Sequence, residues 1–130
     1  MEFHTLLKNL NTKSFFSDLI IERGIEKESL RVDRNGFISK ADHPKSLGSS
    51  YTNSSITTDF AESLIEIVTP TYTNIDELYE KLKAIHVFIN KNLNDGEMLW
   101  PFSMPPRIGN ESDIKIATYG RTNMGKLKHV

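Results

Sequence analysis

The chain has 130 residues, 38% of them hydrophobic and 25% charged, and its formal net charge is −1. These values are typical of one globular domain that can bury a core, and they exclude the basic surface that nucleic acids or anionic membranes require. Cysteine is absent, which excludes disulfides, thiolate metal sites and a cysteine nucleophile. With no signal-peptide pattern and no apolar run of transmembrane length, we expect a cytoplasmic protein without nucleic-acid or membrane partners.

Apolar residues at helical spacing predict a helical start over residues 3–21. The first group is Phe3, Leu6, Leu7 and Leu10. The second group is Phe15, Phe16, Leu19 and Ile20. We interpret both groups as faces of helices, and the second as core packing.

A sheet is predicted over residues 22–69, beginning with a strand at 25–32. Strand periodicity places Glu26 and Glu28 on the same face, in line with Leu30 and Val32, where two like charges repel unless a positive charge lies near. The pair Asn35-Gly36 predicts a hairpin in which 25–32 pairs with 36–40. Residues 41–55 are rich in Ser, Asn, Pro and Gly, and they are predicted to form a long loop.

The stretch 56–70 contains an apolar run, Leu64–Val68, with one acid in its middle. This run predicts a buried or half-buried strand, so Glu66 needs a cation or hydrogen-bond donors to offset its charge. Asp59 lies seven residues earlier, and an unbroken strand would send the two acids to opposite faces. A shared site therefore requires the backbone to bend or bulge between Phe60 and Ser63.

Residues 74–93 are predicted to form a helix that covers the sheet. Asn74 and Glu77 fit an N-cap with a capping box, and the apolar stripe begins at Ile75. His86 lies on or beside this stripe and is interpreted as a hydrogen-bonded core histidine rather than a ligand. The fold class is therefore α+β, an antiparallel sheet with helices packed on one face.

The end of the chain, residues 94–130, is predicted to be rich in loops. The aromatic and proline-rich segment 98–106 is either a rigid loop packed across the sheet or the wall of a pocket. Residues 113–117 suit a short strand or a turn. Residues 119–126 combine glycines with Arg121 and Lys126, which suits an anion such as phosphate.

Four acids form the candidate site: Glu26, Glu28, Asp59 and Glu66. Carboxylate oxygens are the ligands that Mg²⁺ or Mn²⁺ prefers, often together with phosphates of a substrate. The same acids also fit a structural network neutralised by Lys27, Arg23 or Arg31. A pair of carboxylates for glycoside hydrolysis is a further reading, although nothing in the sequence selects a sugar.

Several blocks of the chain resemble, in order, the opening of glutamate–cysteine ligase of the proteobacterial type. The blocks are residues 24–32 (GIEKESLRV), 43–49 (HPKSLGS), 56–66 (ITTDFAESLIE), 99–105 (LWPFSMP) and 119–125 (YGRTNMG). The resemblance runs from about Gly24 to the last residue. It implies a fold like that of glutamine synthetase, with a curved antiparallel sheet around the site and helices outside.

The resemblance also implies an activity, namely the ATP-dependent joining of the γ-carboxyl of glutamate to the amine of cysteine through γ-glutamyl phosphate. This reaction is the first step of glutathione synthesis and uses Mg²⁺. By the same resemblance, Glu26, Glu28, Asp59 and Glu66 match the metal-binding acids, and Phe60 matches a residue near the cysteine pocket. Arg121 and Thr122 depart from the expected pattern of that loop.

Family chains are several times longer, so residues 1–130 are expected to be the N-terminal portion of a larger catalytic domain. We expect this portion to be inactive by itself and to self-associate through an open sheet edge and uncovered apolar surface. The alternative function is a non-catalytic interaction module, in which the acids form salt bridges and residues 100–106 bind a partner.

Overall fold

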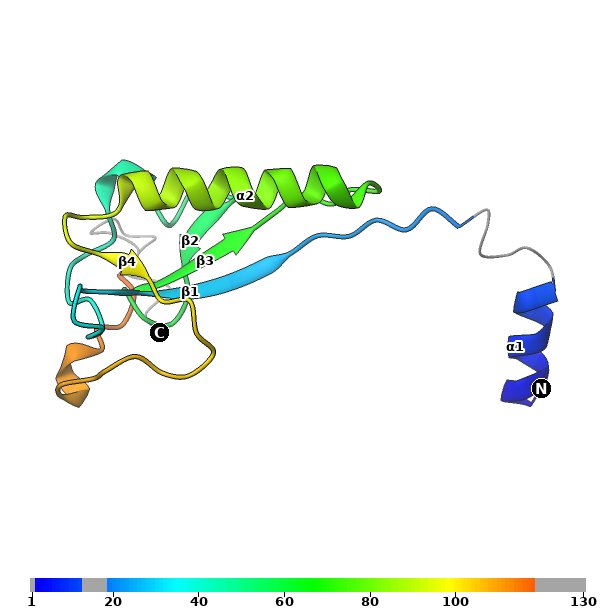
Figure 1. The fold of residues 1–130 in the computed structure, drawn as a ribbon, viewed down its shortest axis with the longest axis horizontal. Coiled ribbons are helices and arrows are strands. Elements are labelled where there is room, and N and C mark those ends of the chain that lie inside the picture. Colours follow the sequence, from blue (N-terminus) through cyan, green and yellow to red (C-terminus); the bar gives the residue numbers. More distant parts are fainter. Residues whose placement is uncertain (1, 13–18, 119–130) are drawn as a thin grey trace.

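A four-stranded antiparallel sheet with one helix across it forms the centre of the computed structural model, which describes residues 2–12 and 19–118 (Figure 1). In chain order the helices and strands are α1 (Phe3–Thr12), β1 (Glu26–Val32), β2 (Ile56–Thr58), β3 (Leu64–Val68), α2 (Ile75–Asn92) and β4 (Met98–Leu99). The strand order is β2-β3-β1-β4. The predicted α+β class with an antiparallel sheet is confirmed. None of the described helices has the length and apolar character needed to traverse a bilayer.

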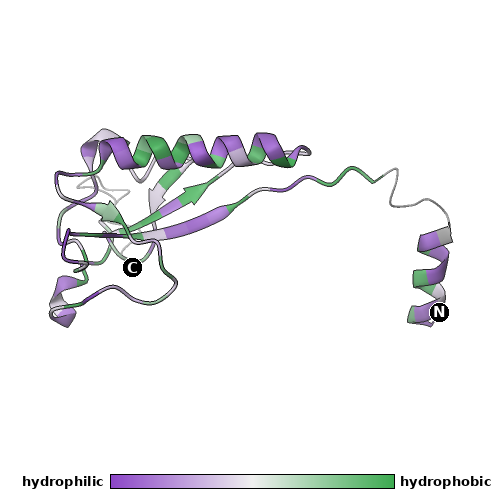
Figure 2. Ribbon diagram, viewed as in Figure 1, coloured by the Kyte–Doolittle hydropathy of each residue, from purple (hydrophilic) through white to green (hydrophobic). Residues whose placement is uncertain are grey.

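The sheet has one covered and one open face because side chains alternate along its strands. Ile56, Ile65 and Ile67 are buried and pack in one cluster with Ile85 and Ile89 of α2. In Figure 2 polar and apolar residues alternate along α2, as expected of a helix with only one covered face. The opposite face of the sheet lies away from α2.

The helix predicted over 74–93 is confirmed as α2. The side chain of Asn74 accepts hydrogen bonds from the backbone N–H groups of Asp76 and Glu77, so the predicted N-cap is present. The predicted apolar stripe is only partly covered, because Ile75 and Tyr79 are 58% and 60% exposed. They lie in the first turns of the helix, outside the buried cluster.

The helical start is shorter than the predicted 3–21. After α1, residues 13–18 lie outside the described part, and Leu19, Ile20 and Ile21 are exposed and not helical. The assignment of Leu19 and Ile20 to the core is therefore wrong. Figure 1 shows α1 apart from the sheet, and a helix with no packed face gains little beyond its own hydrogen bonds.

The predicted hairpin keeps its turn, and its second strand is reduced to a short stretch beside the turn. Gly36 adopts a φ of 78°, and the Asp33 side chain accepts hydrogen bonds from the N–H groups of Asn35 and Phe37. After the turn, the Asp33 N–H donates to the carbonyl of Phe37, the Ser39 N–H donates to that of Arg31, and a bridge joins Ile38 to β1. Arg107 also pairs with this stretch, through backbone bonds to Gly36 and Ile38. The predicted pairing is therefore confirmed next to the turn, and a distant segment adds to it.

Residues 56–68 form a hairpin of two strands rather than one bent strand. β2 and β3 are antiparallel, with Thr57 opposite Glu66 and Thr58 opposite Ile65. The predicted bend falls where it was expected, between Phe60 and Ser63, but there the chain reverses its direction. β4 adds a late strand from outside the predicted sheet range, pairing with Arg31 and Val32 of β1.

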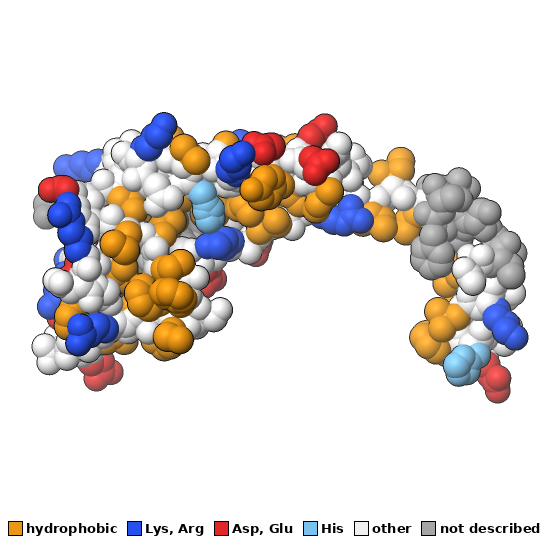
Figure 3. Space-filling view, in the orientation of Figure 1, with side chains coloured by type: hydrophobic (Ala, Val, Ile, Leu, Met, Phe, Trp, Pro, Cys, Tyr) orange, Lys and Arg blue, Asp and Glu red, His pale blue; other side chains and the backbone are white. Residues whose placement is uncertain are grey.

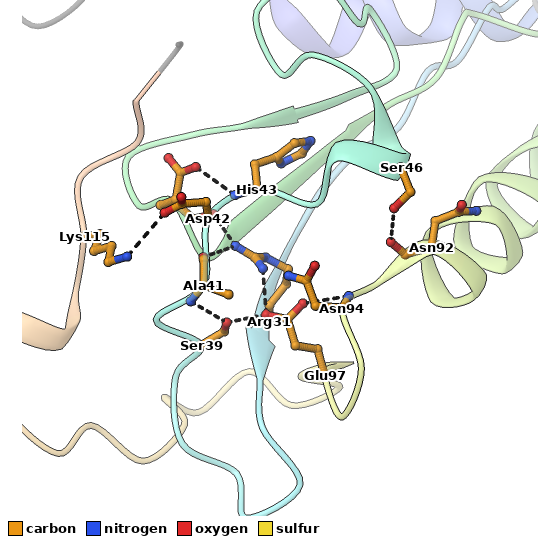
Figure 4. Close-up of polar contacts among 11 residues, drawn as sticks. Arg31, Ser39, Ala41, Asp42, His43, Ser46, Asn92, Asn94, Glu97 and Lys115 are labelled. Atoms are coloured by element: carbon orange, nitrogen blue, oxygen red, sulfur yellow. Dashed lines mark hydrogen bonds and ion pairs between the residues drawn. The ribbon is translucent and has the colours of Figure 1, made fainter. Parts of the chain in front are cut away.

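Arg31 joins four segments around one buried guanidinium (Figure 4). Its side chain is 0% exposed and forms an ion pair with Glu97, at 2.7 Å between Nη1 and Oε1. Nη2 donates to the carbonyl oxygens of Ala41, at 2.8 Å, and Glu62, at 2.9 Å. Ser39 also donates to Glu97. Arg31 therefore connects β1 to the loop after it, to the β2–β3 turn and to the segment that follows α2.

We predict that Arg31→Met lowers the free energy of unfolding by about 3–5 kcal/mol, because it leaves the buried Glu97 carboxylate without its cation. Arg34→Met is the matched control, since the pair of Arg34 with Asp95 is solvent-exposed and 3.6 Å long. The control should lose at most about 1 kcal/mol. Urea unfolding followed by circular dichroism measures both, and equal losses would contradict the assigned role of Arg31.

Candidate functional site

The open face of the sheet carries two glutamates directly opposite each other. Glu28 of β1 faces Glu66 of β3, and Thr57 of β2 lies on the other side of Glu66. Directly opposed residues on one face of an antiparallel pair have Cβ atoms about 4.5–5.5 Å apart. Two carboxylates at this spacing repel, so this position favours a cation between or above them.

The remaining two predicted acids share this face through the strand register. Glu26 lies opposite Val68, two residues along β1 from Glu28. Asp59 continues the β2–β3 pairing, because its N–H donates to the carbonyl of Leu64 at 3.4 Å. The hairpin therefore meets the requirement that the odd spacing of Asp59 and Glu66 imposed. We refer to Glu26, Glu28, Asp59 and Glu66 as the acid face.

The acid face supplies ligand chemistry but not a complete ligand cluster. Among residues 2–12 and 19–118, no three histidine, aspartate or glutamate side chains gather closely enough to hold a metal ion. The cations named in the alternative reading have other partners: Arg31 pairs with Glu97, Lys27 donates to Ser29, and Arg23 donates to the carbonyl of Ile21. Each of these three cations therefore has at least one partner outside the acid face.

A pocket of about 340 Å³ lies beside Glu28 on the same face. Leu30 and Leu64 line it together with the segment Trp100–Pro105, except Pro101, so the predicted pocket wall is present. Trp100 is fixed there, since its backbone N–H donates to Leu30 and its Nε1 donates to the Met104 carbonyl at 2.7 Å. Figure 3 shows hydrophobic side chains gathered over this region, below α2.

Phe60 lies in the turn between β2 and β3, next to Asp59, and its side chain is 67% exposed. The backbone of the turn is held, because the Phe60 carbonyl accepts a hydrogen bond from Ala117. An exposed ring on a fixed turn can contact a ligand on the open face. The predicted anion loop, residues 119–126, lies outside the described residues.

Two histidines have lowered pKa values. Burial lowers the pKa of His43, and the charge of Arg31 lowers it further, against smaller opposite effects from Glu62 and the backbone of Gly48. Burial and the charge of Lys27 lower the pKa of His86, which belongs to α2 and is half-buried. Both side chains therefore favour the neutral form, and neither lies among the acid face residues.

Sequence reasoning missed Glu62 and Glu97, which are as important to this region as the predicted acids. Glu62 is 5% exposed and accepts hydrogen bonds from the N–H groups of His43 and Thr118. Glu97 pairs with Arg31 from 66 positions away. A local pattern does not reveal such partners; the available signal for Glu62 was its place between two small residues, Ala61 and Ser63.

Comparison with known proteins yields consistent matches. A sequence profile of the family described as Glutamate-cysteine ligase matches residues 5–130. The glutamate–cysteine ligase of Hahella chejuensis is 52% identical over 110 residues, which are 85% of this chain and 21% of that protein. That of Bordetella petrii is 44% identical over 128 residues, covering 97% of this chain and 24% of that protein.

Solved structures agree with the sequence matches. The crystal structure of glutamate–cysteine ligase from Francisella tularensis in complex with AMP has a TM-score of 0.77 and 38% identity, covering 82% of this chain and 21% of that one. The crystal structure of a bifunctional glutathione synthetase from Pasteurella multocida has a TM-score of 0.70 and 35% identity, covering 74% of this chain and 13% of that one. This chain therefore spans about a fifth of the length of the curated relatives it matches.

We predict that stability falls as the pH is lowered from about 7 to about 5, in part through His43. The pKa of His43 is lower in the folded state than in the unfolded chain. As the pH falls, the unfolded state therefore binds the proton first and is stabilised relative to the folded state. Each such histidine contributes a slope of at most about 1.4 kcal/mol per pH unit. Urea unfolding at several pH values should give a shallower slope for His43→Gln.

The control for this measurement is His4→Gln, because His4 is exposed on α1. It should leave the slope unchanged. A His43→Gln chain whose stability falls with pH as steeply as that of the original chain would show that His43 does not contribute.

Proposed function

The chain belongs to the glutamate-cysteine ligase family, and on this premise we propose that it forms the N-terminal part of a ligase active site. In the proposed reaction, an oxygen of the glutamate γ-carboxylate attacks the γ-phosphorus of ATP and ADP leaves. The amine of cysteine then attacks the carbonyl carbon of γ-glutamyl phosphate, and phosphate leaves as the amide bond forms. The product would enter glutathione synthesis.

The acid face is the proposed site for Mg²⁺, with Mn²⁺ as a substitute. The observation that carries this proposal is the register that sets Glu28 opposite Glu66 on an open face, with Glu26 and Asp59 beside them. Hard oxygen ligands of this kind suit these ions, and the repulsion between opposed carboxylates would be relieved by binding. A bound ion would neutralise charge on the phosphoryl group during transfer.

The chain's own residues would bind and orient the substrates around this ion. The pocket beside Glu28 offers an apolar floor of Leu30 and Leu64, and a wall built around Trp100. Phe60 lies at the other end of the acid face and is proposed to contact the cysteine substrate. Both elements would restrict water near the acyl phosphate, which otherwise hydrolyses.

Further ligands and most of the ATP site are proposed to come from other parts of a family-length chain, because the described residues lack a three-ligand cluster and span a fifth of the relatives. A location in the cytoplasm stays a prediction. The alternative, a non-catalytic module, would use the same acids only for structure or for binding a partner.

A chimera tests the proposal directly. Residues 1–130 replace the matching segment of the Hahella chejuensis ligase, and ADP formation is measured with and without glutamate and cysteine. We predict turnover by the chimera and none by the 130-residue chain alone. Asp59→Asn and Glu66→Gln should each lower kcat/KM of the chimera by about 10²-fold or more, because phosphoryl transfer depends on electrostatic stabilisation.

Asp76→Asn and Glu80→Gln on the exposed side of α2 are the matched controls, and they should change kcat/KM by less than about twofold. Circular dichroism confirms that each variant is folded. Full activity in the Asp59 and Glu66 variants would favour the module, and amino-acid-dependent ATP turnover by residues 1–130 alone would contradict the proposal that they are only part of the site.

We also predict that the 130-residue chain self-associates. Phe3 of α1 is 70% exposed, and Val87 and Phe88 of α2 are 46% and 45% exposed. Exposed apolar surface favours contact between copies. In sedimentation velocity, the sedimentation coefficient should rise with protein concentration. The rise should be smaller in the Phe3→Ser, Phe88→Ser double variant. A monomer at all concentrations would contradict this prediction.

A further inference from the structure

Glu62 uses all four of its hydrogen-bonding groups, and together they reach three different segments. Its N–H donates to Lys115 at 2.8 Å, and its carbonyl accepts from Arg31 at 2.9 Å. In the side chain, Oε1 accepts from the N–H of His43 at 2.9 Å and Oε2 from the N–H of Thr118 at 2.7 Å. The Thr118 hydroxyl lies 3.4 Å from the same Oε2.

These bonds fix the turn that carries two of the predicted site residues. Asp59 and Phe60 precede Glu62 by three and two positions, in the turn between β2 and β3. Residues 115–118 run alongside this turn, because Ala117 donates to Phe60, Ala61 forms a bridge with Ile116, and Lys115 accepts from Glu62. The carboxylate of Glu62 bonds this segment at Thr118 and the loop after β1 at His43.

The Glu62 carboxylate cannot be replaced by an amide of the same shape without loss. Both oxygens accept from backbone N–H groups whose positions are set by other contacts, whereas a glutamine offers one oxygen and one NH₂ group. The NH₂ group would face an N–H donor, so one contact would become repulsive and a buried donor would lose its acceptor. The two segments that Glu62 joins could then no longer hold the turn from both sides.

We propose that Glu62 is a positioning residue, which holds Asp59 and Phe60 at the end of the acid face without touching the substrates. The inference rests on the proposed function, since it gives a purpose to the position of this turn. This role distinguishes Glu62 from Arg31. The Arg31 side chain bonds the backbone of the turn, whereas the Glu62 side chain bonds the segment 115–118. Glu62 thus controls the geometry at one end of a site whose proposed ligands are other residues.

The experiment uses the ¹⁵N-labelled 130-residue chain, Glu62→Gln and, as the matched control, Glu80→Gln, which changes an exposed glutamate paired with Lys83. In Glu62→Gln the amide resonances of His43, Thr118, Asp59 and Phe60 should shift. The backbone amide hydrogens of residues 59–64 should exchange with solvent about tenfold faster or more. With MnCl₂ as the probe, paramagnetic broadening at Asp59 and Phe60 should fall severalfold, while broadening at Glu28 and Glu66 persists. Glu80→Gln should match the original chain in every measurement.

A loss of overall stability without changes at Asp59 and Phe60 would overturn the proposal, because a merely structural role predicts that result. Unchanged broadening in Glu62→Gln would overturn it as well. If the original chain shows no broadening at the acid face, the proposed metal site fails in this chain, and the amide shifts and exchange at Asp59 and Phe60 alone decide the role of Glu62. If Glu62→Gln does not fold, Glu62→Asp, which keeps the charge but shortens the reach, undergoes the same measurements with the same expected direction.

Discussion

The buried guanidinium of Arg31 is the constraint on which the arrangement of this protein depends. A cation removed from water is stable only when acceptors surround it, and here the acceptors come from Glu97, Ala41 and Glu62. These residues belong to three segments that are not neighbours in the sequence. The fold must therefore bring the loop after β1, the β2–β3 turn and the segment after α2 to the same point before Arg31 can be buried.

The sheet divides its two faces between stability and the candidate chemistry. On one face, isoleucines of β2 and β3 pack against α2 and supply apolar burial. On the other face, Glu28 and Glu66 stand opposite each other, and the repulsion between two like charges opposes the pairing of these strands. Such a conflict between local stability and the use of a site is expected where a protein binds a charged ligand.

Arg31 and Glu62 connect these two faces through hydrogen bonds. Arg31 lies on the covered side of β1, and its Nη2 bonds the carbonyl of Glu62 in the turn. Glu62 in turn bonds Thr118, next to the residue that bonds Phe60. A change in the buried network would therefore reach the acid face through the β2–β3 turn. Burial and site geometry are coupled at this one point of the sheet.

The sequence by itself determined those features that depend on neighbouring residues. The N-cap at Asn74, the covered stripe of α2, the turn at Gly36 and the apolar run around Glu66 follow from local periodicity and turn chemistry, and the ordered blocks of family resemblance added the expected acids. Only the tertiary structure decided that 36–38 pairs with Arg107, that β4 joins β1, and that Arg31 belongs to Glu97 rather than to the acid face. The physical reason is that strand partners and buried ion pairs are chosen by free-energy competition among all segments of the chain, and a local pattern contains no information about the distant segment that wins.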